Sequence, residues 1–270
     1  MRIGYCCEFD PDDAAWAKDA GFTTLEIAYL YDGEDAWKRA REWFDANGLH
    51  PMSVFHYDDY AHPDTVHAEK AIADCYKAMD MCKIVGAPVL ALNAWAGHDG
   101  APKEKLATFK RIFTPMAARA ADMGLKIAIE NCPHGLHNIM WSPDLWEAGF
   151  NEVPNEALGL EYDPSHLVWM GVDYVVALKK FVGRTYAFHA KDTEVFTDKL
   201  EYCGIYGEGW WRYRIPGWGE IDWQKLFTIL WETGYQGDVT IEHEDPVFEG
   251  ARMREGLVRG LEYLSGLVGE

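Results

Sequence analysis

Four short apolar runs in the second half of the chain each end in a side chain that can bind a metal ion. The runs KIAIE, LGLEYD, TYAFH and DVTIE end at Glu130, Asp163, His189 and Glu242. Three carboxylates and one imidazole favour Mn²⁺, Mg²⁺ or Co²⁺ over a structural zinc, which prefers Cys and His ligands. The pattern therefore predicts one divalent ion, Mn²⁺ in first place, with Mg²⁺, Co²⁺ or Zn²⁺ as alternatives.

These four runs belong to a longer alternation of strand and helix patterns. Helical patterns separate the strands, and several of them end at a glycine, the residue that most readily takes a left-handed cap. Eight such units with short connections predict an α/β protein, a single (β/α)8 TIM barrel over residues 1–270. An open doubly wound sheet is weaker, because no G-x-G-x-x-G follows an early strand. The predicted strands are 3–8, 23–28, 52–56, 88–93, 126–130, 158–163, 185–189 and 239–242.

The barrel prediction places the four candidate ligands together. Functional residues of such barrels lie at the C-terminal ends of the strands, and these four come from neighbouring strands five to eight. Taken singly, each carboxylate could also be a solvated strand end or a salt-bridge partner. Glu244 has the same strand parity as Glu242, so both would point inward. Glu242 is preferred as the ligand because VTIE repeats the IAIE pattern before Glu130.

Composition narrows the class of protein. The formal net charge is −19, which disfavours nucleic acid as a partner because an acidic surface repels phosphates. No apolar run approaches the roughly 20 residues that span a bilayer, so a membrane partner is not expected. The N-terminus lacks the apolar segment of a signal peptide. The six cysteines form no C-x-x-C pair and are expected to be reduced thiols of a cytoplasmic protein.

Several motifs together resemble a known family. IAIEN, the DPSH of 163–166, FHAKD, IEHEDP and RIPGWGEIDW (214–223) resemble the xylose isomerase-like TIM-barrel superfamily. The resemblance covers essentially the whole chain, and the nearest branch is the sugar phosphate isomerase/epimerase group with its ketose 3-epimerases. It implies that Glu130, Asp163, His189 and Glu242 are the metal ligands and that the two glutamates are the catalytic acid/base pair. It also implies that His166 and Arg214 bind substrate, and it makes a homo-oligomer, a dimer or tetramer, an option.

The chemistry of such a site is proton transfer next to a carbonyl. A divalent ion held by a carbonyl and its neighbouring hydroxyl stabilises an enediolate, while one carboxylate removes the C–H proton and another returns it. The sequence thus predicts an isomerase or epimerase acting on a sugar, keto-sugar or polyol. If a hydroxyl leaves instead, the enzyme is a lyase (a dehydratase) on a keto-sugar or inosose. An endonuclease IV-like enzyme, which needs more zinc-binding histidines and a basic face, and a non-catalytic sugar-binding barrel are less favoured.

Further polar and aromatic residues could complete the pocket. His56 ends the third strand as a pocket wall or as a core histidine. Lys191 binds a substrate oxygen or pairs with Asp192. Trp95 stacks on a sugar face or lies in the core, and Glu244 is a second polar contact.

The segment 193–219 is expected to be a long loop near the active-site face, since loops of this length are usually functional. Its tryptophans could contact substrate or another subunit. Glu8 and Glu26 end the first two strands and could also line the pocket. Three loop histidines are expected to be exposed: His98, His134 and His137.

Overall fold

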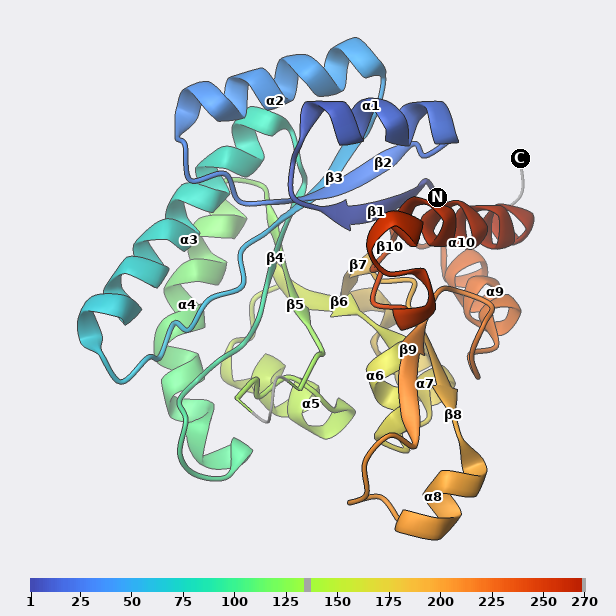
Figure 1. The fold of residues 1–270 in the computed structure, drawn as a ribbon. Helices are drawn as coiled ribbons and strands as arrows, with labels where there is room; N and C mark the ends of the chain where they lie inside the picture. Colours follow the sequence, from blue (N-terminus) through green and yellow to red (C-terminus); the bar gives the residue numbers. More distant parts are fainter. Residues whose placement is uncertain (134–136, 269–270) are drawn as a thin grey trace.

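Eight parallel strands form one sheet that closes into a barrel (Figure 1). The computed structural model describes residues 1–133 and 137–268. The strands are ordered β10-β1-β2-β3-β4-β5-β6-β7, and the ends meet through a parallel bridge between His189 and Thr240. The predicted TIM barrel is therefore confirmed. The strands are β1 (Ile3–Cys7), β2 (Thr24–Ala28), β3 (His50–Phe55), β4 (Val89–Leu92), β5 (Lys126–Glu130), β6 (Leu158–Tyr162), β7 (Thr185–Phe188) and β10 (Val239–Ile241).

Helices cover the outside of the barrel (Figure 1). Several end where the sequence predicts, at a glycine with positive φ such as Gly48 or Gly234. The predicted helix over 102–123 begins instead as a 3-10 turn, η1 (Pro102–Lys105). The barrel helices are α1 (Pro11–Ala20), α2 (Glu34–Asn47), α3 (Thr65–Val85), α4 (Leu106–Asp122), α5 (Pro143–Glu152), α6 (Pro164–Trp169), α7 (Tyr174–Phe181), α9 (Trp223–Thr233) and α10 (Met253–Val268). Three further 3-10 turns are η3 (Val182–Arg184), η4 (Pro246–Phe248) and η5 (Gly250–Arg252). None of the described helices is long and apolar enough to cross a membrane.

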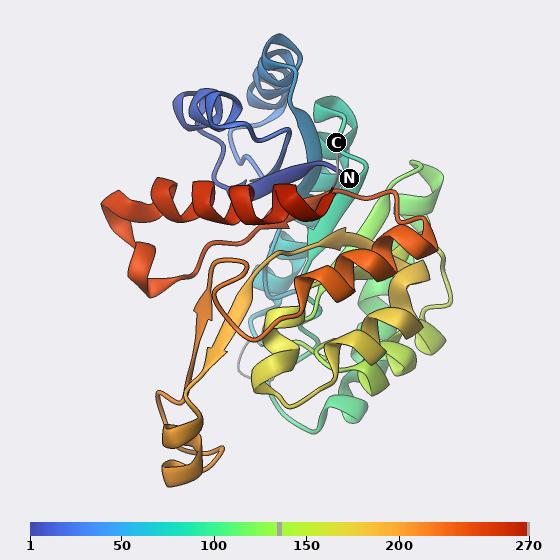
Figure 2. The ribbon, with the colours of Figure 1, turned by 90° about the vertical axis from the view of Figure 1, so that its right-hand side faces the viewer.

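The segment 193–219 was predicted to be a loop, but it contains regular secondary structure, so the prediction of a loop was wrong. It holds an antiparallel hairpin of β8 (Asp192–Val195) and β9 (Trp211–Arg214), with α8 (Thr197–Cys203) between the two strands. Figure 2 shows this excursion, hereafter the arm (192–214), extending away from the barrel. Unlike the short barrel strands, which are apolar runs, β8 (DTEV) and β9 (WRYR) are largely polar or charged, so neither was recognised in sequence.

At two positions in the barrel strands only glycine fits, because the backbone of the next strand lies very close. A Cβ added to Gly4 would lie 2.1 Å from the Thr24 carbonyl oxygen, and one added to Gly159 would lie 2.2 Å from that of Arg184. Nearer the C-terminal end, the register pairs Cys6 with Glu26 and Glu130 with Glu161. Small side chains therefore give way to buried acidic ones towards the end at which the predicted site lies.

Candidate metal centre

The four predicted ligands converge at the C-terminal end of the barrel. Nδ1 of His189 lies 3.2 Å from Oε2 of Glu242, 3.8 Å from Oε1 of Glu130 and 4.0 Å from Oδ2 of Asp163. Asp163 and His189 are at most 1 % exposed. Glu242 follows β10 directly and contacts His189, whereas the prominent contact of the more exposed Glu244 is with Lys191.

Ser165 and Asn131 hold Asp163 in place, and one of its carboxylate oxygens, Oδ2, faces the cluster. Its Oδ1 caps α6 by accepting from the Ser165 N–H (2.8 Å). The Asn131 side chain bonds both the N–H and the C=O of Asp163 (2.8 Å each). Oδ2 is buried and accepts no hydrogen bond within the described ranges. Sequence reasoning missed Asn131, although it directly follows the IAIE run.

A second acidic layer lies behind His189. Its Nε2 is 3.2 Å from Oε2 of Glu26 and 3.3 Å from Oε1 of Glu161. Thr240 donates to the same oxygen of Glu26 (2.9 Å), and Cys6 Sγ is 3.4 Å from Nε2. A carboxylate behind a metal-binding histidine fixes the ring orientation and the nitrogen that carries the proton. Nε2 therefore serves as the donor towards Glu26, and Nδ1 faces the four-residue cluster.

The pKa shifts follow from this crowding. Burial alone lowers the pKa of His189, but Glu161, Cys6 and Glu242 outweigh it and raise that pKa well above its ordinary value. Burial raises the pKa of Glu26, yet His189 lowers it overall. Burial and the neighbouring Glu26 raise the pKa of Glu161. The lower layer thus favours a charged Glu26 beside a protonated ring of His189.

Lys191 lies among the same carboxylates. Its Nζ is 2.5 Å from Oε2 of Glu242, 2.8 Å from Oε2 of Glu244 and 3.2 Å from Oδ2 of Asp163. Lys191 is buried, which lowers its pKa, but Asp163, Glu242 and Glu244 raise it well above its usual value. Against the effect of burial, Lys191 lowers the pKa of Glu242 to about 2.

The alternative partner predicted for Lys191 was wrong. Asp192 instead accepts from the indole N–H of Trp223 (2.8 Å) and from the backbone N–H groups of Thr193, Gly217 and Ile221. It fixes the base of the arm to the loop before α9.

His166 also lies in the site. Its Nε2 is 3.3 Å from both Oε1 of Glu130 and Oδ2 of Asp163, and its Nδ1 is 2.7 Å from the hydroxyl of Tyr213. The ring of Tyr213 lies below Lys191, with Nζ 4.4 Å from the ring centroid. Sequence reasoning missed Tyr213 because it belongs to the unrecognised hairpin.

Other predicted residues lie apart from this cluster. His56 packs against Tyr29 and its Nδ1 is 3.0 Å from the Tyr60 hydroxyl, which favours the core-histidine alternative. Arg214 is buried in ion pairs with Glu194 (2.6 Å) and Asp245 (2.8 Å). These contacts tie the arm to the loop after β10, and the substrate-binding role of Arg214 stays a prediction.

The remaining predicted residues lie in the loops above the barrel or on its surface. Trp95 bridges to Asn138, joining the loops after β4 and β5, and its stacking role stays a prediction. Glu8 is exposed, unlike Glu26. His98 is an ion-pair partner of Asp59, and His134 lies outside the described residues.

The donor set fits a divalent cation. Oδ2 of Asp163 and Nδ1 of His189 are buried and lie 4.0 Å apart. Neither makes a hydrogen bond of regular geometry within the described part of the chain, and their near contacts are ion pairs. Lys191 lies 3.2 Å from Oδ2, and Glu242 lies 3.2 Å from Nδ1. Acidic side chains outnumber the basic ones in this cluster, and a divalent ion would offset that excess. The acidic side chains are Glu26, Glu130, Glu161, Asp163 and the half-buried Glu242, against the basic side chains Lys191, His166 and His189.

Two relatives with a stated activity are inosose dehydratases. That of Clostridium perfringens is 26 % identical over 169 residues, which are 60 % of this chain and only 54 % of the relative. That of Histophilus somni is 25 % identical over 277 residues, 93 % of this chain and 87 % of the relative.

Solved structures share the fold at lower identity. The IOLI protein with a binding zinc atom has a TM-score of 0.78 at 19 % identity, over 99 % of this chain and 98 % of that chain. D-psicose 3-epimerase in the presence of D-fructose has a TM-score of 0.76 at 14 % identity, over the whole of both chains (100 % each). The sequence model of one family matches residues 14–265, and by that match the chain belongs to the xylose isomerase-like TIM-barrel family.

Proposed function

We propose that this chain is a divalent-metal-dependent dehydratase that acts on an inosose or a similar polyhydroxylated ketone. One observation carries the proposal: Glu130, Asp163, His189 and Glu242 converge in one acid-rich, largely buried site at the C-terminal end of the barrel. Hard oxygen donors with one imidazole suit Mn²⁺, Co²⁺ or Mg²⁺, and the zinc of the IOLI neighbour keeps Zn²⁺ as an alternative.

The ion would be held by these four residues. When bound, it would polarise the substrate carbonyl and stabilise negative charge on its oxygen. It would compete with Lys191 for Asp163 and Glu242, and the ammonium would retain Glu244, which is 2.8 Å away. The same residues explain why Lys191 can be buried without an ion.

The chain's own groups complete the reaction. Glu130 or Glu242 takes the proton from the carbon beside the carbonyl. The C–H electron pair forms the C=C bond, and the C–O bond of the neighbouring hydroxyl breaks. An N–H of His166 or Lys191, whose nitrogens lie 3.5 Å apart, gives the departing oxygen its proton, so that water leaves. A net proton is thus passed from substrate carbon to substrate oxygen.

Two observations support dehydration over the isomerase or epimerase reading. Two relatives, aligned with 60 % and 93 % of this chain, are inosose dehydratases. The site also holds N–H donors beside its carboxylates, as an elimination requires. Epimerisation is the second candidate, because both Glu130 and Glu242 approach His189 and could serve opposite faces of a substrate. The homo-oligomer and the cytoplasmic location stay predictions.

Metal content is the first test. Protein purified without chelator is expected to hold about one Mn, Co, Mg or Zn per chain. His189→Ala and Glu130→Gln should lose it, while Glu201→Gln, an exposed change on α8, should retain it. Because loss of a group behind a ligand already costs 10- to 100-fold in affinity or activity, loss of a ligand should cost more than about 100-fold. No metal after incubation with Mn²⁺ would contradict the proposal.

The reaction class is tested with an inosose in D₂O. Loss of water with formation of an unsaturated product identifies the dehydratase. Deuterium in recovered or epimerised substrate without loss of water identifies the epimerase instead. Metal-loaded protein that catalyses neither exchange nor elimination with an inosose or a free ketose would refute both.

A further inference from the structure

The arm is tied firmly to the helix that carries His166. The indole rings of Trp169, at the end of α6, and Trp211, on β9, are stacked with centroids 4.7 Å apart and planes inclined by 4°. The Thr193 hydroxyl donates to the Ser165 carbonyl (2.8 Å). These contacts set the position of Tyr213 relative to His166.

Tyr213 contacts the far nitrogen of His166. Its hydroxyl oxygen is 2.7 Å from His166 Nδ1 and receives a hydrogen bond from the indole N–H of Trp169 (3.2 Å). Two carboxylates face the other ring nitrogen, which favours a proton on Nε2, so the contact is assigned as a hydrogen bond from the Tyr213 hydroxyl to His166 Nδ1. A histidine that accepts at Nδ1 carries its proton on Nε2 when neutral. That N–H points at Glu130 and Asp163.

The two site histidines are therefore supported in opposite ways. His189 has an acceptor behind it, Glu26, so Nε2 keeps its proton and Nδ1 is the nitrogen that would give a lone pair to an ion. His166 has a hydroxyl donor behind it, which leaves an N–H facing the cluster. The first arrangement suits a ligand of a cation. The second suits a donor to an oxygen.

We propose that Tyr213, from the arm, is a positioning residue that holds His166 with its proton on Nε2, so that His166 donates a hydrogen bond to a substrate oxygen and does not bind the ion. The inference rests on the proposed function, since it names the residue that sets the donor of that site. Tyr213 also supports the second donor, because its ring lies below Lys191. The arm, which extends outside the barrel, thus contributes to the site through a side chain that does not itself contact substrate.

The protonated nitrogen can be observed directly. In metal-free protein labelled with ¹⁵N-histidine, long-range ¹H–¹⁵N correlation spectra distinguish Nδ1–H from Nε2–H rings, and His166→Gln identifies the His166 signals. Wild type should show the proton on Nε2 and an Nδ1 shift typical of a hydrogen-bond acceptor. Tyr213→Phe should move the Nδ1 shift towards that of a free nitrogen. Tyr202→Phe, 94 % exposed on the same arm, should not.

Kinetics give the second readout. Tyr213→Phe should lower kcat by about 10-fold, because residues that support a site residue typically contribute about 10- to 100-fold. KM and metal affinity should stay within about 2-fold of wild type. A proton on Nδ1 of His166 in wild type, or a Tyr213→Phe spectrum identical to wild type, would overturn the inference. The wild-type spectrum decides even if Tyr213→Phe does not fold. Since it is recorded without metal, its failure leaves the metal test of the proposed function untouched.

Discussion

The two ends of this barrel differ in how their polar side chains are paired. At the C-terminal end, acidic side chains crowd around two histidines and a lysine, and several of their polar atoms make no hydrogen bond within the described residues. Glu26, Glu161 and Asp163 are all fully buried there. Such crowding lowers the stability of the folded protein unless a cation or substrate binds there. This is typical of functional sites.

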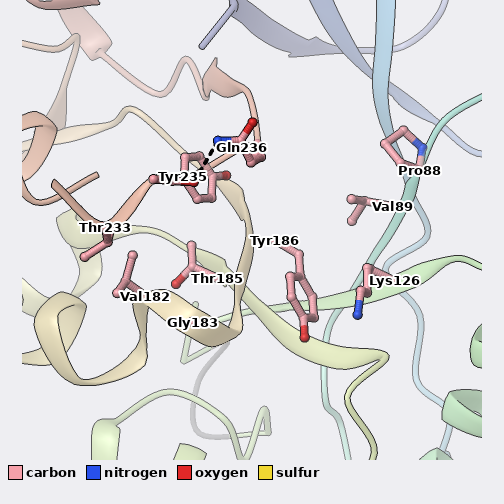
Figure 3. Close-up of a pocket in the computed structure, with 12 residues that line it drawn as sticks. Pro88, Val89, Lys126, Val182, Gly183, Thr185, Tyr186, Thr233, Tyr235 and Gln236 are labelled. Atoms are coloured by element: carbon pink, nitrogen blue, oxygen red, sulfur yellow. Dashed lines mark hydrogen bonds between the residues drawn. The ribbon is translucent and has the colours of Figure 1, made fainter. Parts of the chain in front are cut away.

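The N-terminal end has a cavity but no such crowding. Figure 3 shows this cavity of 430 Å³ between the starts of β4, β5, β7 and β10. Its polar side chains already bond nearby backbone: Lys126 and Tyr186 both donate to the Glu156 carbonyl, and Gln236 donates to that of Gly234. The polar side chains named here thus already have backbone partners, whereas the acidic cluster gathers charged groups against one another.

The largest effect expected from this comparison comes from the group behind His189. Glu26→Gln removes the charge that holds Nε2–H, so His189 should lose its preferred orientation for an ion. Metal affinity should fall about 10- to 100-fold. Competition with a chromophoric chelator measures the change.

Glu244→Gln is the matched control, because this carboxylate also belongs to the C-terminal end but is 46 % exposed and contacts Lys191 rather than His189. It should change metal affinity by less than about 3-fold, since exposed ion pairs contribute little. If Glu244→Gln weakened metal binding more than Glu26→Gln, the assignment of Glu242 as the ligand would have to be exchanged for Glu244.

The sequence predicts the barrel and the position of the cluster because both follow from local patterns. Each buried strand is an apolar run, and parallel strands in a barrel place their last residues at one rim. Glu130, Asp163, His189 and Glu242 could therefore be identified from the sequence alone. Glu26 was recognised only as a strand-end acid, because its contact with His189 joins residues 163 positions apart.

The arm could not be predicted in this way. Its four-residue strands pair only with each other, and the WRYR of β9 has an aromatic and a basic face but is too short to be distinguished from loop sequence. Tyr213 and Arg214 are adjacent, yet the first contacts His166 and the second pairs with Asp245. Which of two neighbours faces the site depends on the register of the hairpin, and sequence patterns do not encode that register here.

At the N-terminal end, stability and not activity should respond to mutation. Asp238 joins the starts of three strands: it accepts from the backbone N–H of Arg2 (3.1 Å) and lies 2.9 Å from Nδ1 of His50. Burial raises its pKa, but His50 and Arg2 lower it overall. Because the folded state holds fewer protons, this carboxylate stabilises the fold above its ordinary pKa of about 4 and stops doing so as pH falls through its lowered pKa.

Asp238→Asn should therefore lower the free energy of unfolding by about 2 kcal/mol at pH 7, as for hydrogen bonds to a charged group. Urea denaturation of both proteins between pH 3 and pH 7 measures the difference, which should shrink below about pH 4. Metal affinity and kcat should be unchanged. A constant difference across the pH range would show that shape, and not charge, accounts for the role of Asp238.

The smallest effect is expected at the cavity itself. Tyr186→Phe removes the hydroxyl that donates to the Glu156 carbonyl (2.5 Å) and keeps the ring beneath Lys126, whose Nζ lies 4.7 Å from its centroid. The free energy of unfolding should fall by no more than about 1 kcal/mol, because the carbonyl keeps its bond from Lys126. kcat/KM should stay within about 2-fold, measured with the substrate that the inosose assay identifies. A larger loss of activity would mean that the cavity communicates with the acidic cluster through the barrel interior, and the separation of the two ends would be wrong.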